Sequence, residues 1–427
     1  MTTREILKNC GLEQCLQKKE KTQLDAHFLL PVQPHDVCKK SIKIKNIYEL
    51  DSWLAWKGCV PHFENEKTNF ENYIGIEKLD YDRLKTEIEN IQIMQLKKNR
   101  WLGEAPEFSL NREVIFVEKV IIPKSDRILI IGDIHCSVTS MLNILSFWYE
   151  QKWISNDFTL APQLHLIFLG DIIDRGAYGT ELITLMFLLK HANRDRVFAI
   201  NGNHETCATF HEYGMHTEIA KKFGSESLAF LLQHMSFLQY QPSTIIVEYG
   251  NDRFQFSHGA FSPNLKDQAN IDQLLQSDKT LLFVRYYSQN CKTLQKGDMD
   301  QQKWGDFIGT EADTTSLRGK NVKTFGWRST LNYLKKLNIT CIISGHQDLS
   351  NFTMLLSPFC SKKAKEFDPN YKTLYRPQDY GKKTFPSVVS YEPGKDFIAV
   401  NTSTALDSKG NSALQYDCFL LLKSAVY

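Results

Sequence analysis

The most constraining feature of this sequence is a pattern that recurs five times between residues 127 and 346. Each copy is a short run rich in Ile, Leu, Val and Phe, with Gly and an Asp, Asn or His at its end. Such runs predict buried β-strands that are followed by tight turns. The five copies are Arg127–Asp133, Leu164–Asp171, Val197–His204, Phe254–Gly259 and Ile339–His346.

Helical periodicity separates these predicted strands, and the alternation favours an α/β fold. Residues Ser140–Gln151, Thr180–His191 and Ser329–Leu337 are predicted to be helices. Strands that alternate with helices form sheets covered on both faces, and sites form beyond the carboxyl ends of such strands. Three further strands in the tail predict a second sheet packed on the first: Ser387–Ser390, Asp396–Asn401 and Gln415–Leu422.

Composition limits the function classes. The 51 basic and 49 acidic residues give a net charge of +2, so nothing in the charge favours nucleic-acid binding. Ten cysteines without C-x-x-C spacing fit reduced thiols, and Met1–Glu20 lacks the apolar segment of a Sec-type signal peptide. Polar residues interrupt the uncharged stretch Leu228–Val247, so no membrane span is expected. We therefore predict a cytoplasmic protein.

The chain is predicted to have two parts. Residues 1–112 are expected to form an accessory segment that is partly helical around Glu77–Asn99. A possible role of this segment is to bind an unidentified protein partner. Residues 113–427 form the catalytic domain, with helical insertions near 207–240 and 265–317, where Leu274–Tyr287 is expected to be a helix. The basic segment Ser361–Lys383 is expected to be a surface loop, and Asp407–Asn411 a turn.

The residues at the strand ends predict a metal centre. Mixed carboxylate, imidazole and amide ligands suit Mn, Fe or Zn, and six ligands suffice for two ions that share one carboxylate. Two ions about 3.5–4 Å apart clamp the attacking and leaving oxygens of an in-line displacement, most simply on a phosphate monoester. Arg175 can bind a phosphate bidentately. The candidate ligands are Asp133, His135, Asp171, Asn203, His258 and His346.

These motifs together resemble those of a known family. Gly132–His135, Gly170–Gly176, Gly202–Glu205 and Ser257–Ala260 resemble the signature of the phosphoprotein phosphatase family of calcineurin-like metallophosphatases. The likeness continues in the family's order through Trp304–Asp306, Leu317–Gly319, Thr324–Gly326 and Gly345–Gln347, and covers roughly residues 113–427. It implies an α/β fold, a β-sandwich flanked by helices.

The resemblance also implies a role for each residue. Asp133 and His135 would hold the first metal, Asp171 would bridge, and Asn203, His258 and His346 would complete the second. His204 would protonate the leaving oxygen with Asp174 as its partner, while Arg175, Arg318 and Asn203 would bind the phosphate. The simpler alternatives are that Asp174 is only a helix N-cap, that Arg318 is only a surface residue, and that Glu205 supports the site without reacting.

Several positions depart from the family pattern. Cys136 and Ala260 stand where the family has Gly, and each adds a Cβ where the backbone needs unusual dihedrals or close approach. Asn201 replaces an Arg, and the family's late Pro-Asn-Tyr loop has no match after Ser403. The pattern indicates a divergent or prokaryotic-type branch, whose preference for phosphoserine, phosphothreonine or phosphotyrosine is open.

Three functions remain from this reasoning. The first is a phosphoprotein phosphatase that uses two divalent ions, with Mn expected and Fe or Zn as alternatives, and a hydroxide held between them as the nucleophile. The second is a hydrolase of dinucleoside polyphosphates or other small phosphoanhydrides. The third is a phosphatase-like scaffold that binds phosphoproteins without turnover, against which the complete ligand set and His204 argue.

Overall fold

A computed structural model of the 427-residue chain describes the strand-forming and site-forming parts of the sequence. Among these residues, no helix combines the length and the apolar character that crossing a bilayer would need. The described residues are 22–29, 101–102, 112–176, 178–206, 209–223, 238, 241–262, 268–276, 282–290, 301–319, 321–347, 352–356, 374–375, 388–394, 397–402 and 417–424.

One sheet of the described structure has six strands, in the order β16-β1-β18-β4-β5-β6. Strands β4, β5 and β6 run parallel to one another, and β18 pairs antiparallel with both β4 and β1. The predicted alternation of buried strand and helix is confirmed here. The bounds are β1 Thr22–Leu29, β4 Arg127–Ile131, β5 Leu164–Phe168, β6 Val197–Ala199, β16 Val388–Tyr391 and β18 Asp417–Ser424.

A second sheet has nine described strands, in the order β15-β14-β17-β13-β8-β7-β3-β9-β2. At its centre, β13 runs parallel to both β8 and β17. The bounds are β2 Trp101–Leu102, β3 Arg112–Ile122, β7 Thr244–Tyr249, β8 Asp252–Ser257, β9 Leu282–Asn290, β13 Cys341–Ser344, β14 Phe352–Leu356, β15 Leu374–Tyr375 and β17 Phe397–Thr402. A small third sheet pairs β10 Asp306–Phe307, β11 Thr314–Thr315 and β12 Lys323–Phe325.

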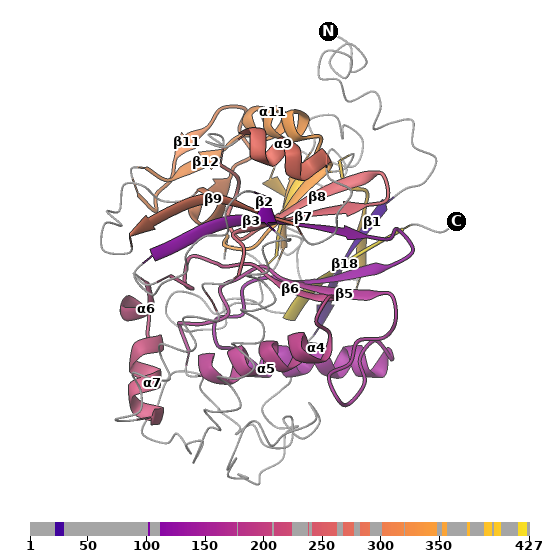
Figure 1. Cartoon of the computed structure of the whole chain (residues 1–427), viewed down its shortest axis with the longest axis vertical. Helices are drawn as coiled ribbons and strands as arrows, with labels where there is room; N and C mark the ends of the chain where they lie inside the picture. The colour runs from indigo at the N-terminus through magenta and orange to yellow at the C-terminus, as the bar shows by residue number, and fades with distance from the viewer. Residues whose placement is uncertain are drawn as a thin grey trace.

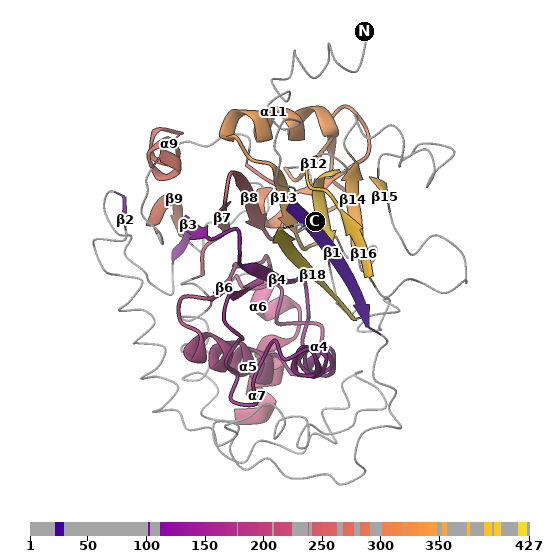
Figure 2. The same cartoon turned by 90° about the vertical axis from the view of Figure 1, so that its right-hand side faces the viewer.

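The two large sheets lie between layers of helices (Figures 1 and 2). Helices α4 (Val138–Glu150) and α5 (Gly179–Ala192) cover the outer face of the first sheet, α7 (Met215–Phe223) packs against α5, and α9 (Gln268–Gln276) and α11 (Trp327–Leu337) cover the second sheet. A buried apolar cluster that includes Ile130, Ile167, Phe256 and Ile343 fills the space between the sheets. This is the predicted sandwich, and the remaining helices are α6 Thr209–Glu212 and α10 Gln301–Trp304.

Strand register explains why the polar strand ends meet. Ile131 pairs with Phe168 and Phe168 with Ala199, so β4, β5 and β6 end level with one another. Ser257 pairs with Ser344 in the same way in the second sheet. Parallel strands that end level deliver the residues that follow them to one edge.

The first 112 residues contribute two strands that the sequence reasoning did not place, β1 and the short edge strand β2. Strand β1 lies inside the six-stranded sheet, paired with β18 on one side and β16 on the other. Leu24 and Ala26 are fully buried in the cluster between the sheets. Thr22–Leu29 is thus part of the sandwich, while the division of the chain at residue 112 and the partner of this segment stay predictions. The helix expected at Glu77–Asn99 lies outside the described residues.

The expected helix at Leu274–Tyr287 is wrong from Leu282 onward. Helix α9 ends at Gln276, and Leu282–Asn290 forms strand β9, which pairs with β3 and β2. Pairing with two neighbours outweighs the helical spacing of the apolar residues in that stretch. The insertion near 265–317 is therefore mixed rather than helical, whereas α6 and α7 lie in the insertion near 207–240. Of the segment Ser361–Lys383 only β15 is described, and the turn predicted at Asp407–Asn411 lies outside the described residues.

Candidate metal centre

Close backbone approach shapes the turns after β5 and β6. Gly170 has a φ of +91°, and a Cβ added there would lie 2.6 Å from the backbone nitrogen of Gly202. Neither space nor dihedral suits another residue, so glycine is required at position 170. The two turns are thereby packed against each other, with Asp171 on one and Asn203 and His204 on the other.

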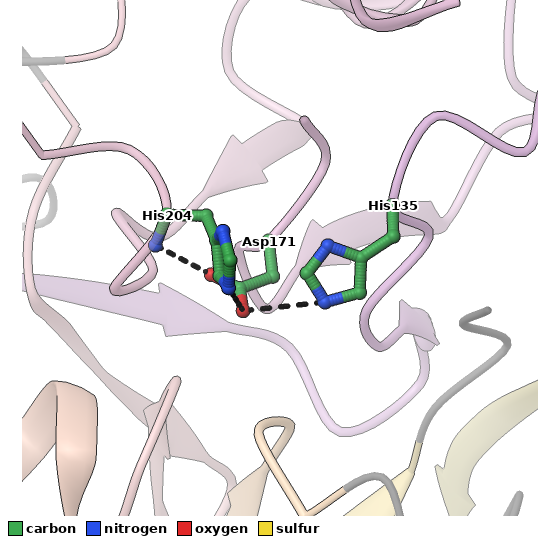
Figure 3. A group of neighbouring side chains, drawn as sticks. All are labelled: His135, Asp171 and His204. Atoms are coloured by element: carbon green, nitrogen blue, oxygen red, sulfur yellow. Dashed lines mark hydrogen bonds and ion pairs between the residues drawn. The ribbon is translucent and has the colours of Figure 1, made fainter. Parts of the chain in front are cut away.

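Asp171 lies at the centre of the predicted ligands. It is 1% exposed, and its Oδ2 lies 3.1 Å from Nε2 of His258 and 3.5 Å from Nε2 of His135. Figure 3 shows the Asp171 carboxylate between the rings of His135 and His204, each carried by a different loop. His204 is slightly farther away, with its Nε2 at 3.8 Å from the same oxygen.

Backbone carbonyls fix the orientation of three histidine rings. Nδ1 of His135 donates to the carbonyl of Ile173 at 2.9 Å, and Nδ1 of His258 donates to that of Leu169 at 2.8 Å. His346 instead donates from Nε2 to the carbonyl of Trp304 at 3.1 Å. Because a neutral imidazole carries one proton, the other nitrogen of each ring keeps its lone pair. These are the nitrogens that face Asp171 or its immediate neighbours.

The remaining two candidate ligands also lie in the cluster. Oδ1 of Asn203 lies 2.9 Å from Nε2 of His258. Asp133 accepts the backbone N–H of His346 on both oxygens, at 2.9 and 3.0 Å, and its Oδ1 lies 3.8 Å from Nδ1 of His258. Asp133 thus lies close to His258 and His346, and its role as a ligand of the first metal stays a prediction.

The arrangement fits two divalent cations on either side of Asp171. There are two groups of side chains within each of which the possible ligand atoms all lie within 4.8 Å of one another. One group is His135, Asp171 and His204, and the other is Asp171, His258 and His346. Asp171 belongs to both. Nε2 of His135 is buried without a hydrogen-bond partner, which is unfavourable unless a cation accepts its lone pair. Mixed nitrogen and oxygen donors of this kind suit first-row divalent metals.

Burial and charge act in opposite directions on these groups. Burial lowers the pKa of His135 and of His346 well below the usual value, which keeps both rings neutral as metal ligands must be. Burial also opposes charge on His258, but Asp171 and Asp133 raise the pKa of this ring to about 9. A cation binding here would therefore compete with a proton on His258.

A second pair of buried residues adjoins the centre. Nδ1 of His204 and Oδ2 of Asp174 are 2.8 Å apart, and the backbone N–H of Met215, the first residue of α7, donates to Oδ1 of Asp174 at 2.9 Å. Burial opposes protonation of His204, but Asp171 and Asp174 raise its pKa above the usual value. Asp174 precedes α5 yet binds a different helix, so its interactions are those of a histidine partner rather than of an N-cap for α5.

The two predicted phosphate-binding arginines reach the centre from different sides. Nη2 of Arg175 lies 3.4 Å from Nε2 of His204. Arg318 donates from Nε to Oδ2 of Asp306 and from Nη2 to the carbonyl of His346, both at 3.1 Å. Arg318 is therefore held against the loop that carries His346, and it is not a freely projecting surface residue.

Strained backbone is concentrated in this region. Six of the non-glycine residues with positive φ lie in it, and each position costs about 1–2 kcal/mol relative to the right-handed region. Cys136, at φ +62°, has the unusual dihedral that its replacement of a glycine led us to expect. Ala260 does not have a positive φ and is fully buried in the core beside Phe261. The six residues are His135, Cys136, Asp171, Asp174, Arg175 and His346.

Sequence reasoning missed two residues that contact the site and a third that joins two helices beside it. Tyr213 packs edge-on against His204 with ring centroids 4.7 Å apart, and it is 43% exposed. Trp304 supplies the carbonyl that orients His346, although only its motif was noted. Glu218 of α7 accepts the backbone N–H groups of Gly179 and Thr180 and so attaches α7 to the start of α5. None follows a strand end, which was the signal used to find the others.

Comparison with known proteins gives consistent results. A Caenorhabditis elegans protein whose name provisionally classes it as a serine/threonine-protein phosphatase is 29% identical over 237 residues, 55% of this chain. A Schizosaccharomyces pombe protein named in the same provisional way is 28% identical over 241 residues, 56% of this chain and 69% of the yeast protein. The chain spans only 57% of the length of the worm protein.

A similar solved structure is that of a protein serine/threonine phosphatase from Saccharomyces cerevisiae with similarity to human phosphatase PP5. It has 16% sequence identity and a TM-score of 0.48, and the match covers 78% of this chain and 81% of that one. The family model for calcineurin-like phosphoesterases matches residues 126–348, just over half of the chain and the part that carries all the predicted site residues. The protein is therefore a member of the calcineurin-like phosphoesterase family.

Proposed function

We propose that this protein is a metal-dependent phosphatase that hydrolyses phosphomonoesters of phosphoproteins. The observation that carries the proposal is the position of Asp171, which belongs to two ligand groups at once and lies 3.8 Å from the His204 ring. The names of the worm and fission-yeast relatives support phosphoserine and phosphothreonine as substrates. Manganese, the cytoplasmic location and a partner for residues 1–112 stay predictions from the sequence.

The ligands would hold two divalent cations, with Asp171 between them. His135 would face one side, with His204 beside it as an acid and not as a ligand, and His258, His346 and Asn203 would face the other. Such ions lower the pKa of a bound water and neutralise charge on a phosphoryl group. The protein contributes rings whose orientation is already fixed by the carbonyls of Ile173, Leu169 and Trp304.

The residues beside the metal centre would handle the phosphate and the leaving group. The guanidinium of Arg175 lies beside His204 and that of Arg318 beside the backbone of His346, and both would bind the non-bridging phosphate oxygens. With Nδ1 held by Asp174, His204 would donate a proton from Nε2 to the departing seryl or threonyl oxygen. The raised pKa of His204 favours the protonated ring that this step needs.

Hydrolysis assays test this proposal. Full-length protein supplied with Mn²⁺ should release phosphate from p-nitrophenyl phosphate and from phosphopeptides, and Asp171→Asn should lose at least about a hundredfold in rate. Asp126→Asn is the matched control, because Asp126 also pairs with a histidine, His165 at 3.0 Å, but at the opposite end of β4.

The substrate panel separates the competing functions. Phosphoserine, phosphothreonine and phosphotyrosine peptides are compared with diadenosine tetraphosphate at equal concentration. Faster hydrolysis of the peptides supports the proposal. Faster hydrolysis of the nucleotide would replace it with the phosphoanhydride hydrolase, and metal binding without any turnover would leave only a phosphoprotein-binding scaffold.

A further inference from the structure

Glu205 is a buried carboxylate that the chemistry described so far does not use. It is 4% exposed and follows His204 directly in the chain. Its Oε2 accepts the backbone N–H of Asp171 and that of Gly202, both at 2.8 Å. Its Oε1 accepts the N–H of Ile172 at 2.8 Å and lies 3.5 Å from the nitrogen of Ile173.

These hydrogen bonds join the two turns that carry the centre of the site. Asp171 lies on the turn after β5, whereas Gly202 lies on the turn after β6 that also carries Asn203 and His204. A single oxygen, Oε2, binds both turns, and together with the backbone N–H of His204, which donates to Oδ1 of Asp171 at 3.0 Å, it sets the separation of Asp171 from Asn203 and His204. The backbone of Asp171 is in the left-handed region at φ +50°, and the two bonds to Asp171 and Ile172 hold that conformation in place.

We infer that Glu205 is a positioning residue that sets the metal affinity of the site by fixing Asp171 between the two ligand groups. This inference rests on the proposed function for the identity of the site as a metal centre. Glu205 is not a member of either group of ligand atoms. Its effect passes through the backbone of Asp171, whose carboxylate both groups share.

Replacement by glutamine is a sharp test because both oxygens of Glu205 are needed. Glutamine has nearly the same shape, but one of its terminal atoms is an NH₂ group, which is a donor only. If that group takes the place of Oε2, it faces the N–H groups of Asp171 and Gly202. If it takes the place of Oε1, it faces that of Ile172. Either orientation leaves at least one buried donor opposed to a donor.

Glu218→Gln is the matched control. Glu218 is also a fully buried carboxylate that accepts two backbone N–H groups, those of Gly179 and Thr180 at 3.0 and 2.9 Å. These belong to the start of α5, and neither is on the turn of Asp171 or of Gly202. Loss of a buried carboxylate acceptor is thus common to both variants, whereas loss of the bond between the two turns is confined to Glu205→Gln.

The experiment measures Mn²⁺ binding to metal-free full-length protein by calorimetry, together with thermal unfolding and the kcat and KM for p-nitrophenyl phosphate at saturating Mn²⁺. Glu205→Gln should weaken Mn²⁺ binding by about tenfold to a hundredfold, as loss of a residue behind a metal ligand does. It should also lower kcat more than it changes KM. Glu218→Gln should lower the unfolding temperature and leave Mn²⁺ affinity within about twofold of wild type, since the backbone N–H groups that it binds belong to the start of α5 and its contact with the His135 turn is limited to the thiol of Cys136, whose Sγ lies 4.0 Å from Oε2.

Two outcomes overturn the inference. One is a folded Glu205→Gln protein with wild-type Mn²⁺ affinity and kcat. The other applies if that variant does not fold: Glu205→Asp, which keeps the charge but shortens the reach, is then measured in the same way, and wild-type affinity in it refutes the role. Failure of the proposed function looks different, because wild-type protein would then bind Mn²⁺ without hydrolysing any phosphate ester.

Discussion

Strand β1 contains a histidine whose burial should make the stability of the whole sandwich depend on pH. His27 is 8% exposed, and its ring stacks on Phe419 of β18 with centroids 4.6 Å apart and an interplanar angle of 6°. Its Nε2 is buried without a hydrogen-bond partner. Desolvation is the main cause that lowers the pKa of His27 from 6.5 to about 4. The nearby Asp25 acts to raise this pKa, and the nearby Lys423 acts to lower it.

The sign and size of the effect follow from that shift. Between pH 6.5 and about 4 the unfolded chain binds a proton on His27 that the folded chain does not, so stability falls as the pH falls through this window. The full shift of about 2.5 pKa units corresponds to about 3 kcal/mol, of which about 2 kcal/mol is lost between pH 7 and pH 5. The variant His27→Phe retains an aromatic ring against Phe419 but cannot take up a proton.

Urea unfolding at pH 7 and at pH 5 measures this difference. Because other groups titrate in the same range, the drop in the free energy of unfolding from pH 7 to pH 5 is measured for wild type and for His27→Phe. The drop should be about 2 kcal/mol larger in wild type. Any pH-independent cost of the larger ring cancels. His191→Gln, at an exposed position on α5, should retain the wild-type dependence. Equal pH dependence in wild type and His27→Phe would refute the burial of β1 between β16 and β18.

Further predictions concern the site and the same strand. His204→Asn should lower kcat about a hundredfold to ten-thousandfold, with Mn²⁺ affinity changed much less, as steady-state kinetics and calorimetry would show; an unchanged kcat would exclude His204 as the acid. Arg318→Ala should raise KM for phosphopeptides about tenfold or more, whereas Arg328→Ala, at an exposed residue paired with Glu311, should not; equal KM values would remove Arg318 from phosphate binding. Leu24→Ala should cost about 2–5 kcal/mol in urea unfolding because Leu24 is fully buried between the sheets, and a loss below about 0.5 kcal/mol would contradict its position.

The parts of the fold that were predicted correctly are those that short stretches of sequence determine. Helices α4, α5 and α11 and the strands that end in Asp171, Asn203 or His346 have strong local patterns of apolar residues and Gly. The site followed from them, because parallel strands that end level must bring their next residues together. That is why residues more than two hundred positions apart, such as Asp133 and His346, were expected in one place and lie hydrogen-bonded there.

The parts that were missed depend on pairing between distant segments. Strand β1 pairs with β18 nearly four hundred residues later, and nothing in the local pattern of Thr22–Leu29 specifies that neighbour. In Leu282–Asn290 the helical spacing of apolar residues was followed in preference to its Phe, Val and Tyr content, which favours a strand. The roles of Glu205 and Glu218 depend on backbone N–H groups of turns and helix ends, which a sequence pattern does not locate.

The central claim is that Asp171 lies between two divalent cations, and anomalous diffraction tests it most directly. Crystals of the full-length protein grown with Mn²⁺ would be measured near the manganese absorption edge. Two anomalous peaks are predicted, one beside His135 and Asp171 and one beside Asp171, His258 and His346. A single peak, or peaks that do not contact Asp171, in crystals with saturating Mn²⁺ would contradict the account.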